Sequence, residues 1–316
     1  IYIEYSIYGL IISFLNHDTN QHLSNLRYDR YIIVKNIIIT NEADFMSYRV
    51  IALDLDGTLL DNQKRILPES LEVLQQARQQ GVKVLIVTGR HHVAIRPFYQ
   101  ALELDTPAIC CNGTYLYDYL GKKVIESDPL TTDAASQIIQ RLADTNIHRL
   151  MYVDDAMLYD NQETIARTLQ WSNTLPVDLR PNLLQVDDFN QAMLDYKSIW
   201  KFALTTPDRN ELHEFTQSIE KDLGLECEWS WEDQVDIAQS GNSKGKRLKR
   251  WVESQGLSMQ DVLAFGDNFN DLSMLTTAGL GVAMGNAVDE IKQQAALVTR
   301  DNTQPGIAEV IRKYVL

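Results

Sequence analysis

The 316-residue chain is poor in basic side chains: 29 lysines and arginines stand against 43 aspartates and glutamates, giving a net charge of −14. This balance argues against a broad surface for nucleic acid or for an anionic membrane. A small anionic substrate remains compatible with it, because a bound metal or one lysine reverses the field locally. The sequence also lacks an apolar run of the about 18 residues that span a bilayer. We therefore expect a cytoplasmic protein that acts on a small molecule.

Cysteine is scarce, and the three copies, Cys110, Cys111 and Cys227, lack the spacing of a metal site. We interpret them as idle thiols in a reducing compartment. The length suits one large or two modest domains, and a hydrophobic fraction of 45% is ordinary for a globular protein. Nothing in the sequence predicts an oligomeric state.

Residues 1–45 differ from the rest in composition. They are rich in Ile, Tyr and Asn, contain one glycine and no proline, and begin with Ile1. They show no regular hydrophobic period, although 31–39 fits a short strand. A well-formed strand pattern starts only after Met46. We expect Met46 to be the biological start and 1–45 to be an extension without a fold of its own; the alternative is an arm that binds a partner.

From Met46 onward, short apolar runs alternate with helical patterns. The runs typical of buried parallel strands are 49–55, 82–87, 108–111, 262–265, 281–283 and 297–298. The helices expected from spacing and boundary signals are 68–80, 93–102 (with Pro97 inside it), 271–277 and 288–294. This alternation predicts an α/β fold, a Rossmann-like, doubly wound parallel sheet with helices on both faces. Ligands of such sheets bind beyond the carboxyl ends of the strands.

The stretch from 131 to 237 breaks this alternation. Its own strand candidates are 150–153, 198–204 and 227–231, and its helix candidates are 133–144 and 209–223. A segment of about 100 residues is enough for a second α/β domain. We expect a core domain formed by 46–130 and 238–316, with an inserted domain at 131–237.

Polar side chains follow the first strand in the motif Asp54-Leu-Asp-Gly-Thr. Residues i and i+2 of a strand point the same way, so Asp54 and Asp56 are expected to converge where the strand ends. The pair either caps a turn or transfers a phosphoryl group, with Asp54 attacking phosphorus and Asp56 exchanging protons with the leaving oxygen and then with water. A carboxylate about 4 Å from a phosphate is repelled by roughly 4 kcal/mol per unit-charge pair at a dielectric constant of about 20. The chemistry therefore requires cations.

The motif Gly-Asp-Asn-Phe-Asn-Asp after a later strand offers ligands for a metal. It contains Asp267, Asn270 and Asp271 within about one helical turn. Carboxylate oxygens, completed by phosphate and water, are what Mg²⁺ prefers. The alternative is that Asp267 or Asp271 only caps the following helix.

Lys244 offers a second cation. Asn242 and Ser243 before it are good helix caps, so Lys244 is expected near a helix N-terminus, where anions are favoured. Thr88 and Gly89, after the second strand, offer a hydroxyl and a backbone N–H to phosphate oxygens. We interpret the bases that follow Lys244 as a solvated helix face: Lys246, Arg247, Lys249 and Arg250.

In this order the motifs Asp-x-Asp-Gly-Thr, Thr-Gly-Arg, Lys-Gly and Gly-Asp-x-x-Asn-Asp resemble those of the haloacid dehalogenase superfamily. The segment Met284-Gly-Asn-Ala is similar to its Cof-type branch. The resemblance runs from Met46 to the C-terminus, and it implies a phosphatase that uses Mg²⁺ and an aspartyl-phosphate intermediate. It implies a nucleophile at Asp54 and an acid and base at Asp56. The implied metal ligands are Asp54, Asp56 (through its backbone carbonyl), Asp267 and Asp271. The implied phosphate-binding residues are Leu55, Thr88, Gly89, Lys244 and Asn270.

The position of the insertion narrows the substrate class. The stretch between Asp56 and Thr88 is too short for a cap, whereas the one between Arg90 and Lys244 is long enough. The resemblance thus implies a C2-type cap, which closes over small phosphorylated metabolites and excludes water. The segments 88–95, 110–117 and 226–231 resemble bacterial members that hydrolyse pyridoxal phosphate. We expect pyridoxal 5′-phosphate as substrate; the alternatives are a broad-specificity sugar phosphate phosphatase and a non-catalytic metabolite sensor.

Several side chains of the insertion and its surroundings are candidates for substrate contact without a motif behind them. Trp229 and Trp231 alternate on an expected strand, so they either stack on a flat ring or belong to the core of the cap, which we favour. His91 and His92 either line the mouth of the pocket or belong to an ordinary polar loop, which we favour. The remaining candidates are Tyr152, Asp154 and Lys201.

Overall fold

The structure is a computed structural model of the chain, and it describes residues 26–28, 31–34, 37–40, 48–231 and 233–316. The chain forms two units, Ile1–Ser47 and Tyr48–Leu316. In the first unit, β1 (Leu26–Tyr28), β2 (Tyr31–Val34) and β3 (Ile37–Thr40) form an antiparallel sheet. The single strand expected over 31–39 is therefore two strands. Met46, the expected start, lies outside the described residues.

The second unit contains a five-stranded parallel sheet in the order β17-β16-β15-β4-β5. Its strands are β4 (Val50–Leu53), β5 (Lys83–Ile86), β15 (Val262–Gly266), β16 (Leu280–Ala283) and β17 (Leu297–Val298). Each lies inside a predicted apolar run or differs from it by one residue at an end. The alternating pattern is thus sufficient to locate this sheet.

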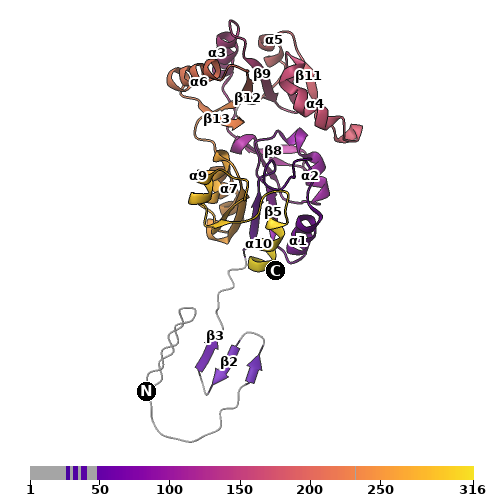
Figure 1. Ribbon diagram of the computed structural model, residues 1–316, viewed down its shortest axis with the longest axis vertical. Coiled ribbons are helices and arrows are strands. Elements are labelled where there is room, and N and C mark those ends of the chain that lie inside the picture. The colour runs from indigo at the N-terminus through magenta and orange to yellow at the C-terminus, as the bar shows by residue number, and fades with distance from the viewer. Residues whose placement is uncertain (1–25, 29–30, 35–36, 41–47, 232) are drawn as a thin grey trace, which may run out of the picture. The chain divides into compact units, whose positions relative to one another are not determined.

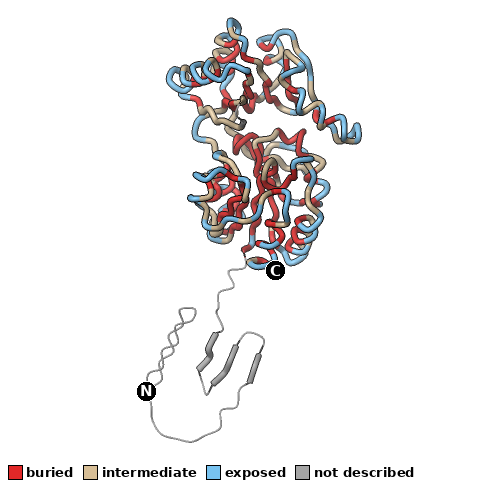
Figure 2. The backbone as a smooth tube through the Cα atoms, viewed as in Figure 1, coloured by how far each residue is buried: buried red, intermediate tan, exposed pale blue. Residues whose placement is uncertain are grey.

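Both faces of the parallel sheet are covered by helices (Figures 1 and 2). Ile51 and Leu53 of β4 pack in one apolar cluster with α1 (Pro68–Gln79) and α10 (Gly306–Tyr314). Val50 and Ala52, which point the other way, pack in a second cluster with α7 (Lys244–Ser254), α8 (Leu272–Leu275) and α9 (Asp289–Gln294). A strand covered on both faces is apolar at every position. This is the doubly wound core that the sequence predicts.

Two local predictions need correction. The helix expected over 93–102 is a short 3₁₀ turn, His92–Ala94, followed by α2 (Arg96–Ala101). Pro97 lies in the first turn of α2, where the missing N–H leaves no intrahelical bond unmade. After β6 (Ala108–Cys110) the chain forms an unpredicted antiparallel hairpin of β7 (Tyr115–Asp118) and β8 (Lys123–Ser127).

The inserted cap is built on a six-stranded sheet in the order β11-β10-β9-β12-β14-β13. The strands are β9 (His148–Val153), β10 (Ala156–Tyr159), β11 (Leu183–Gln185), β12 (Ile199–Thr205), β13 (Glu226–Trp231) and β14 (Gln234–Ala238). All neighbours are antiparallel except β10 and β11. The sequence predicted β9, β12 and β13 and missed the other three.

Helices cover one face of the cap sheet. Apolar side chains of α3 (Thr132–Leu142), α5 (Phe189–Met193) and α6 (Arg209–Leu223) form a cluster with those of the sheet. The remaining helix, α4 (Ala166–Ser172), packs instead against the cluster that contains α1 and α2. The other face of the cap sheet is thus directed at the core.

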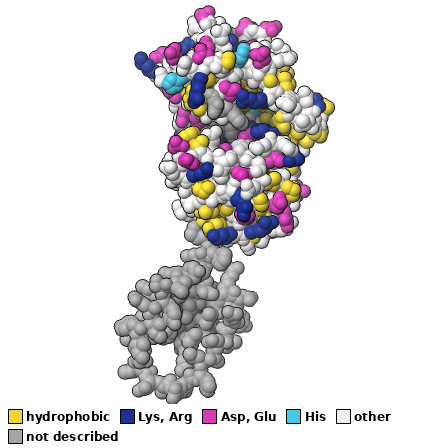
Figure 3. Space-filling view, in the orientation of Figure 1, with side chains coloured by type: hydrophobic (Ala, Val, Ile, Leu, Met, Phe, Trp, Pro, Cys, Tyr) yellow, Lys and Arg dark blue, Asp and Glu magenta, His cyan; other side chains and the backbone are white. Residues whose placement is uncertain are grey.

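None of the described helices has the length and the apolar character that a membrane span requires. Figure 3 shows acidic and basic side chains interspersed over the cap and the core.

Candidate active site

The predicted site residues follow the strands of the parallel sheet at their carboxyl ends. Asp54 comes directly after β4, Asp267 directly after β15, and Thr88 shortly after β5. The backbone N–H of Asp54 donates to the carbonyl of Phe265 at 3.1 Å, which ties the ends of β4 and β15 together. This edge is where an open α/β sheet binds its ligands.

Three carboxylates meet at this edge. One oxygen each of Asp54, Asp267 and Asp271 lies within 4.8 Å of the others. Burial, and then the neighbouring Asp271, raises the pKa of Asp54 well above its usual range and raises the pKa of Asp267 to about 7. Charge repulsion of this kind is relieved by a cation, so the cluster has the composition of a metal site.

Lys244 lies against the same carboxylates. Its Nζ donates to Asp54 Oδ1 at 2.7 Å and to Asp271 Oδ1 at 2.6 Å, and the side chain is buried. Burial alone would lower the pKa of Lys244, but Asp271 and Asp54 together raise it above its ordinary value. The side chain of Ser243 accepts a hydrogen bond from the backbone of Lys246 and caps α7, as the sequence predicts. Lys244 is therefore a fixed ammonium on the first turn of that helix.

Asp271 has two roles at once. Its Oδ2 accepts hydrogen bonds from the backbone N–H groups of Asp267 at 2.9 Å and Asn268 at 3.0 Å. It thereby closes the 3₁₀ turn Phe269–Asp271, as in a capping box. Asp271 thus caps this turn, but capping is not its only contact, because the other carboxylate oxygen accepts from Lys244.

The carboxylate of Asp56 has different partners. It forms a bidentate ion pair with Arg90, at 2.6 Å to Nε and 2.7 Å to Nη2, and a further one with Lys64 at 2.5 Å. Burial raises the pKa of Asp56, but Arg90 and Lys64 outweigh it and lower the pKa below the ordinary value. Strand β4 ends at Leu53, so strict strand alternation does not govern where Asp56 points. With these partners the carboxylate of Asp56 is unprotonated and can accept a proton. It can carry and donate a proton only when the ion pairs with Arg90 and Lys64 weaken.

Arg90 also contacts the cap. Its guanidinium lies 4.9 Å from the ring of Trp171 on α4 and 5.3 Å from that of Phe98 on α2. The rings of Trp171 and Phe98 stack with centroids 5.8 Å apart. One arginine therefore joins the carboxylate of Asp56 to a side chain of the cap.

Thr88, Gly89 and Asn270 surround an asparagine that the sequence did not single out. Asn270 Nδ2 donates to Asn112 Oδ1 at 3.2 Å, and the Oδ1 of Asn270 is buried without a partner. A Cβ on Gly89 would lie 2.8 Å from Asn112 Oδ1, so only glycine lets Asn112 approach. The hydroxyl of Thr88 accepts from the backbone N–H of Arg90 at 3.1 Å. Leu55, buried between Asp54 and Asp56, has only its backbone to offer.

Comparison with known proteins gives this site a family. The family model of the haloacid dehalogenase-like hydrolases matches residues 51–311. The chain belongs to this family. Solved structures agree: a haloacid dehalogenase-like hydrolase from B. subtilis superposes with a TM-score of 0.74 at 25% identity, covering 85% of this chain and 100% of that one.

Among curated relatives of this hydrolase, pyridoxal phosphate phosphatase YbhA of Escherichia coli is 57% identical over 272 residues, which are 86% of this chain and 100% of the relative. The 5-amino-6-(5-phospho-D-ribitylamino)uracil phosphatase YitU of Bacillus subtilis is 30% identical, over 84% of this chain and 97% of the relative. The resemblance drawn from the motifs is thereby confirmed.

Some side chains of the hydrolase lie elsewhere than expected. Arg247 is not solvated: it is buried on α7 and donates to the carbonyls of Gly113 and Thr114 and to Asp128, which holds the hairpin after β6. Lys246 and the other two bases of that stretch are exposed, as predicted. Lys244 and Arg247 are three residues apart and therefore lie on the same, buried face of α7, whereas the exposed bases lie on the other face.

His91 and His92 form neither a pocket mouth nor a polar loop. Both are buried; His91 Nε2 lies 2.7 Å from the carbonyl of Val153 in the cap, and His92 stacks on Tyr117. Burial, and for His91 also the neighbouring His92, lowers both pKa values, that of His92 to about 3. The two neutral rings are thus packing groups at the junction of core and cap.

The tryptophan prediction is confirmed for Trp229. This side chain packs against the apolar cluster of the cap, next to Arg209, as favoured from the sequence. The side chain of Trp231 lies outside what the structure describes. Asp154 accepts from the backbone of Lys197, so it orders a turn of the cap.

Two contacts in the site are made by the last residue of a sequence motif. Thr58 donates to Asp267 Oδ1 at 2.7 Å, and it is the last residue of the Asp-x-Asp-Gly-Thr motif. Arg90 is likewise the last residue of Thr-Gly-Arg. Lys64 and Asn112 have no such signal, because their partners are known only once the chain is folded.

Proposed function

We propose that this chain is a magnesium-dependent phosphatase that hydrolyses a small phosphate monoester through a phospho-aspartate. The observation that carries the proposal is the contact of a buried ammonium, Lys244, with Asp54 inside a cluster of three carboxylates. A carboxylate approaches a phosphate dianion only where cations offset the repulsion. Stability alone does not explain a buried group of charges, because well-packed apolar side chains are often as stabilising or more so.

In the first half-reaction, a carboxylate oxygen of Asp54 attacks phosphorus and the bond from phosphorus to the ester oxygen breaks. Asp56 gives a proton to the departing alkoxide, so the product leaves as a neutral alcohol. The ion pairs of Asp56 with Arg90 and Lys64 must loosen for this step, since they favour the unprotonated carboxylate.

In the second half-reaction, water attacks the phosphorus of the acyl phosphate on Asp54. Asp56 takes the proton of that water, the bond from phosphorus to the Asp54 oxygen breaks, and inorganic phosphate leaves. Asp56 is well set for this base role, because Arg90 and Lys64 keep it ionised. Lys244, Asn270, Thr88, Gly89 and the backbone of Leu55 are the proposed phosphate contacts.

Magnesium fits the donor set. Asp54, Asp267 and Asp271 offer hard carboxylate oxygens close enough to share one ion, and a backbone carbonyl at Asp56 is the further proposed ligand. When bound, the ion supplies positive charge that offsets the negative charge on the transferring phosphoryl group. Thr58 and the backbone N–H of Asp267 orient the carboxylates from behind.

Removing the metal is expected to silence the enzyme. Excess EDTA should abolish turnover of phosphate esters, and Mg²⁺ in excess of the chelator should restore it. Calcium, which prefers more ligands at longer distances, should restore less. Steady-state phosphate release checks this, and full activity in chelator would contradict the metal role.

Gly57→Ala is expected to weaken metal binding specifically. Gly57 has φ +82°, and a Cβ there would lie 2.2 Å from Asp267 Oδ2, so the carboxylate must move. We expect the Mg²⁺ concentration for half-maximal activity to rise by roughly 10- to 100-fold. Gly81→Ala is the matched control: φ is +87° and nothing lies within 4 Å of the added Cβ. Both variants carry the same backbone strain, so an equal change in the Mg²⁺ requirement would show that Asp267 is not involved.

Pyridoxal 5′-phosphate is the proposed substrate, with pyridoxal and phosphate as products. The support is the 57% identity, over its whole length, to an E. coli protein named for that activity. Relatives named for a phosphorylated ribitylaminouracil are 28–30% identical. Sugar phosphates and such polyol phosphates are therefore the competing substrates. Values of kcat/KM over a panel of phosphomonoesters test the choice, and pyridoxal 5′-phosphate near the bottom of the ranking would reject it.

The domain boundaries are part of the same proposal. We place the core at 46–130 and 238–316 and the cap at 131–237, with 1–45 outside the enzyme. In support, all six strands of the cap sheet lie between His148 and Ala238. A cytoplasmic location is proposed with them and agrees with the free thiols of Cys110, Cys111 and Cys227.

A further inference from the structure

One face of the cap sheet carries polar side chains where the other is apolar. Tyr152 on β9 pairs with Lys201 on β12, and Asp236 on β14 pairs with both Ala203 on β12 and Glu228 on β13. Paired residues of neighbouring strands point to the same face of a sheet, and so do residues two apart on one strand, such as Lys201 and Ala203. All of these side chains therefore lie on one face of the cap sheet. The alternate positions belong to the apolar cluster under the helices: Met151, Val153, Phe202, Leu204, Val235 and Ile237. We call Tyr152, Lys201, Glu228 and Asp236 the cap-sheet polar cluster.

The cluster contains a deeply buried ion pair. Lys201 and Asp236 are 2% and 3% exposed, their Nζ and Oδ2 atoms are 2.5 Å apart, and Nζ also lies 4.7 Å from the centre of the Tyr152 ring. Removing both charges from water costs several kcal/mol for each ion, and apolar side chains in their place are often as stable or more so. A buried charge pair in a cleft is therefore a candidate for ligand recognition.

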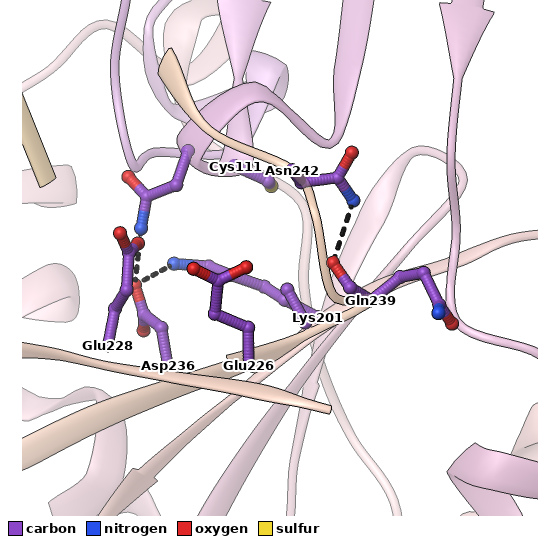
Figure 4. Close-up of a pocket in the computed structure, with 9 residues that line it drawn as sticks. Cys111, Lys201, Glu226, Glu228, Asp236, Gln239 and Asn242 are labelled. Atoms are coloured by element: carbon purple, nitrogen blue, oxygen red, sulfur yellow. Dashed lines mark hydrogen bonds and ion pairs between the residues drawn. The ribbon is translucent and has the colours of Figure 1, made fainter. Parts of the chain in front are cut away.

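The cluster lies next to the phosphate site. Asn112 Nδ2 donates to Asp236 Oδ2 at 3.4 Å, while Asn112 Oδ1 accepts from Asn270. The backbone of Cys111 and Asn112 is left-handed, with φ of 50° and 56°, a conformation that costs about 1–3 kcal/mol at each non-glycine residue. In this conformation the Asn112 amide lies between Asn270 of the core and Asp236 of the cap. In Figure 4 the side chains of Lys201, Glu226, Glu228 and Asp236 point toward one another across the pocket.

The charge states define what the cluster can bind. Burial alone would lower the pKa of Lys201, but Asp236 raises it above the ordinary value, so Lys201 is an ammonium that donates hydrogen bonds and is no nucleophile. Burial, and then Asp236, raises the pKa of Glu228 to about 7. Glu228 therefore gains from a partner that brings a positively charged N–H. The two side chains are complementary to a ring with one anionic oxygen and one cationic nitrogen.

We propose that the cap-sheet polar cluster recognises the aromatic ring of the leaving group, with Lys201 donating to an anionic ring oxygen and Glu228 accepting from a ring N–H. This inference rests on the proposed function, because the pyridoxal ring carries a phenolate and a pyridinium. A sugar offers neutral hydroxyls, which can hydrogen-bond to an ammonium or a carboxylate but bring no complementary charge. In this structure the cavity beside the cluster measures about 10 Å³, room for about one water. The ring is therefore seated by lifting the cap sheet from Asn112 and closing it again.

The test compares two esters with the same reacting group. Pyridoxal 5′-phosphate and benzyl phosphate both place the phosphate on a methylene attached to an aromatic ring, but the benzyl ring has no polar atoms. For Lys201→Met and Glu228→Met, kcat/KM on pyridoxal 5′-phosphate should fall by roughly 10- to 100-fold, the loss of one charge-assisted hydrogen bond. On benzyl phosphate it should change by less than about threefold. Arg149→Met is the matched control, since Arg149 pairs with Asp160 on the opposite face of the same sheet; it should leave the ratio of the two esters unchanged.

Lys201→Met alone leaves Asp236 buried without its partner, so the double variant Lys201→Met/Asp236→Leu removes the pair as a unit. It should unfold no earlier than the single variant and show the same selective loss, which supports the inference. If the wild type cleaves pyridoxal 5′-phosphate well and the folded variants lose both activities equally, or neither, the inference fails and the proposed function stands. If the wild type cleaves benzyl phosphate but not pyridoxal 5′-phosphate, the inference and the choice of pyridoxal 5′-phosphate as substrate both fail, while the phosphatase activity stands.

Discussion

Asp54→Asn is expected to lower kcat by about 10⁴-fold or more without weakening the fold. The amide keeps the shape of the side chain and can still accept from Lys244, but it cannot attack phosphorus. Burial and the neighbouring Asp271 raise the pKa of Asp54, so its charge destabilises the metal-free protein at neutral pH. Removing that charge should leave the temperature of unfolding unchanged or raise it. Activity and stability should thus move in opposite directions.

Phosphate release and thermal unfolding without metal measure the two effects of Asp54→Asn. Asp289→Asn, in which an exposed carboxylate on α9 is changed in the same way, is the control and should alter neither. In the wild type, acid quenching during turnover should trap one phosphoryl group on the peptide that contains Asp54, detected by mass spectrometry. Turnover by Asp54→Asn above a hundredth of the wild-type rate, or a trapped phosphoryl group elsewhere, would rule out the proposed nucleophile.

Lys244→Met is expected to be costly for both activity and stability. Lys244 is the buried ammonium that contacts Asp54 and Asp271, and methionine of similar length leaves these carboxylates facing one another. Removing one partner of a buried ion pair destabilises a protein by about 3–5 kcal/mol. Loss of the charge at the phosphate should lower kcat/KM by about 10²-fold or more. Urea unfolding and steady-state kinetics measure these quantities.

Lys246→Met is the control for Lys244→Met. It lies two residues further on the same helix and is exposed, and its side chain donates to the carbonyl of Gly241. Its replacement should change the free energy of unfolding by less than about 0.5 kcal/mol and leave kcat/KM within twofold. Equal effects at the two positions would mean that charge on α7, rather than the contact with the carboxylates, accounts for the result.

The core of the fold was predictable because its strands are covered on both faces. Val50 to Leu53 is apolar at every position for that reason, and the change to Asp54 marks the end of the strand. Since the carboxyl ends of parallel strands lie at one edge, the strand pattern alone predicts that Asp54 and Asp267, far apart in sequence, lie at the same edge of the sheet. Short-range chemistry also placed Ser243 as a cap and hence Lys244 at a helix start.

What the sequence did not predict depends on partners that are distant and carry no motif. The contacts of Asn112 with Asn270 of the core and with Asp236 of the cap form only after segments far apart in the sequence have met. Strands β10, β11 and β14 of the cap were missed because they are short, with four, three and five residues. Lys201 was one of several candidates without a motif, since a two-residue period shows which face of a strand a residue shares but not what that face contacts.

The contact between Trp171 and Arg90 connects the cap to the carboxylate of Asp56. The guanidinium of Arg90 pairs with Asp56 and also lies against the ring of Trp171. Moving the cap away therefore changes the surroundings of the Asp56 carboxylate. On the proposed mechanism, movement of the cap and proton transfer by Asp56 are then linked. A change in the cap that removes the ring of Trp171 therefore alters, on this mechanism, the rate of turnover as well as the choice of substrate.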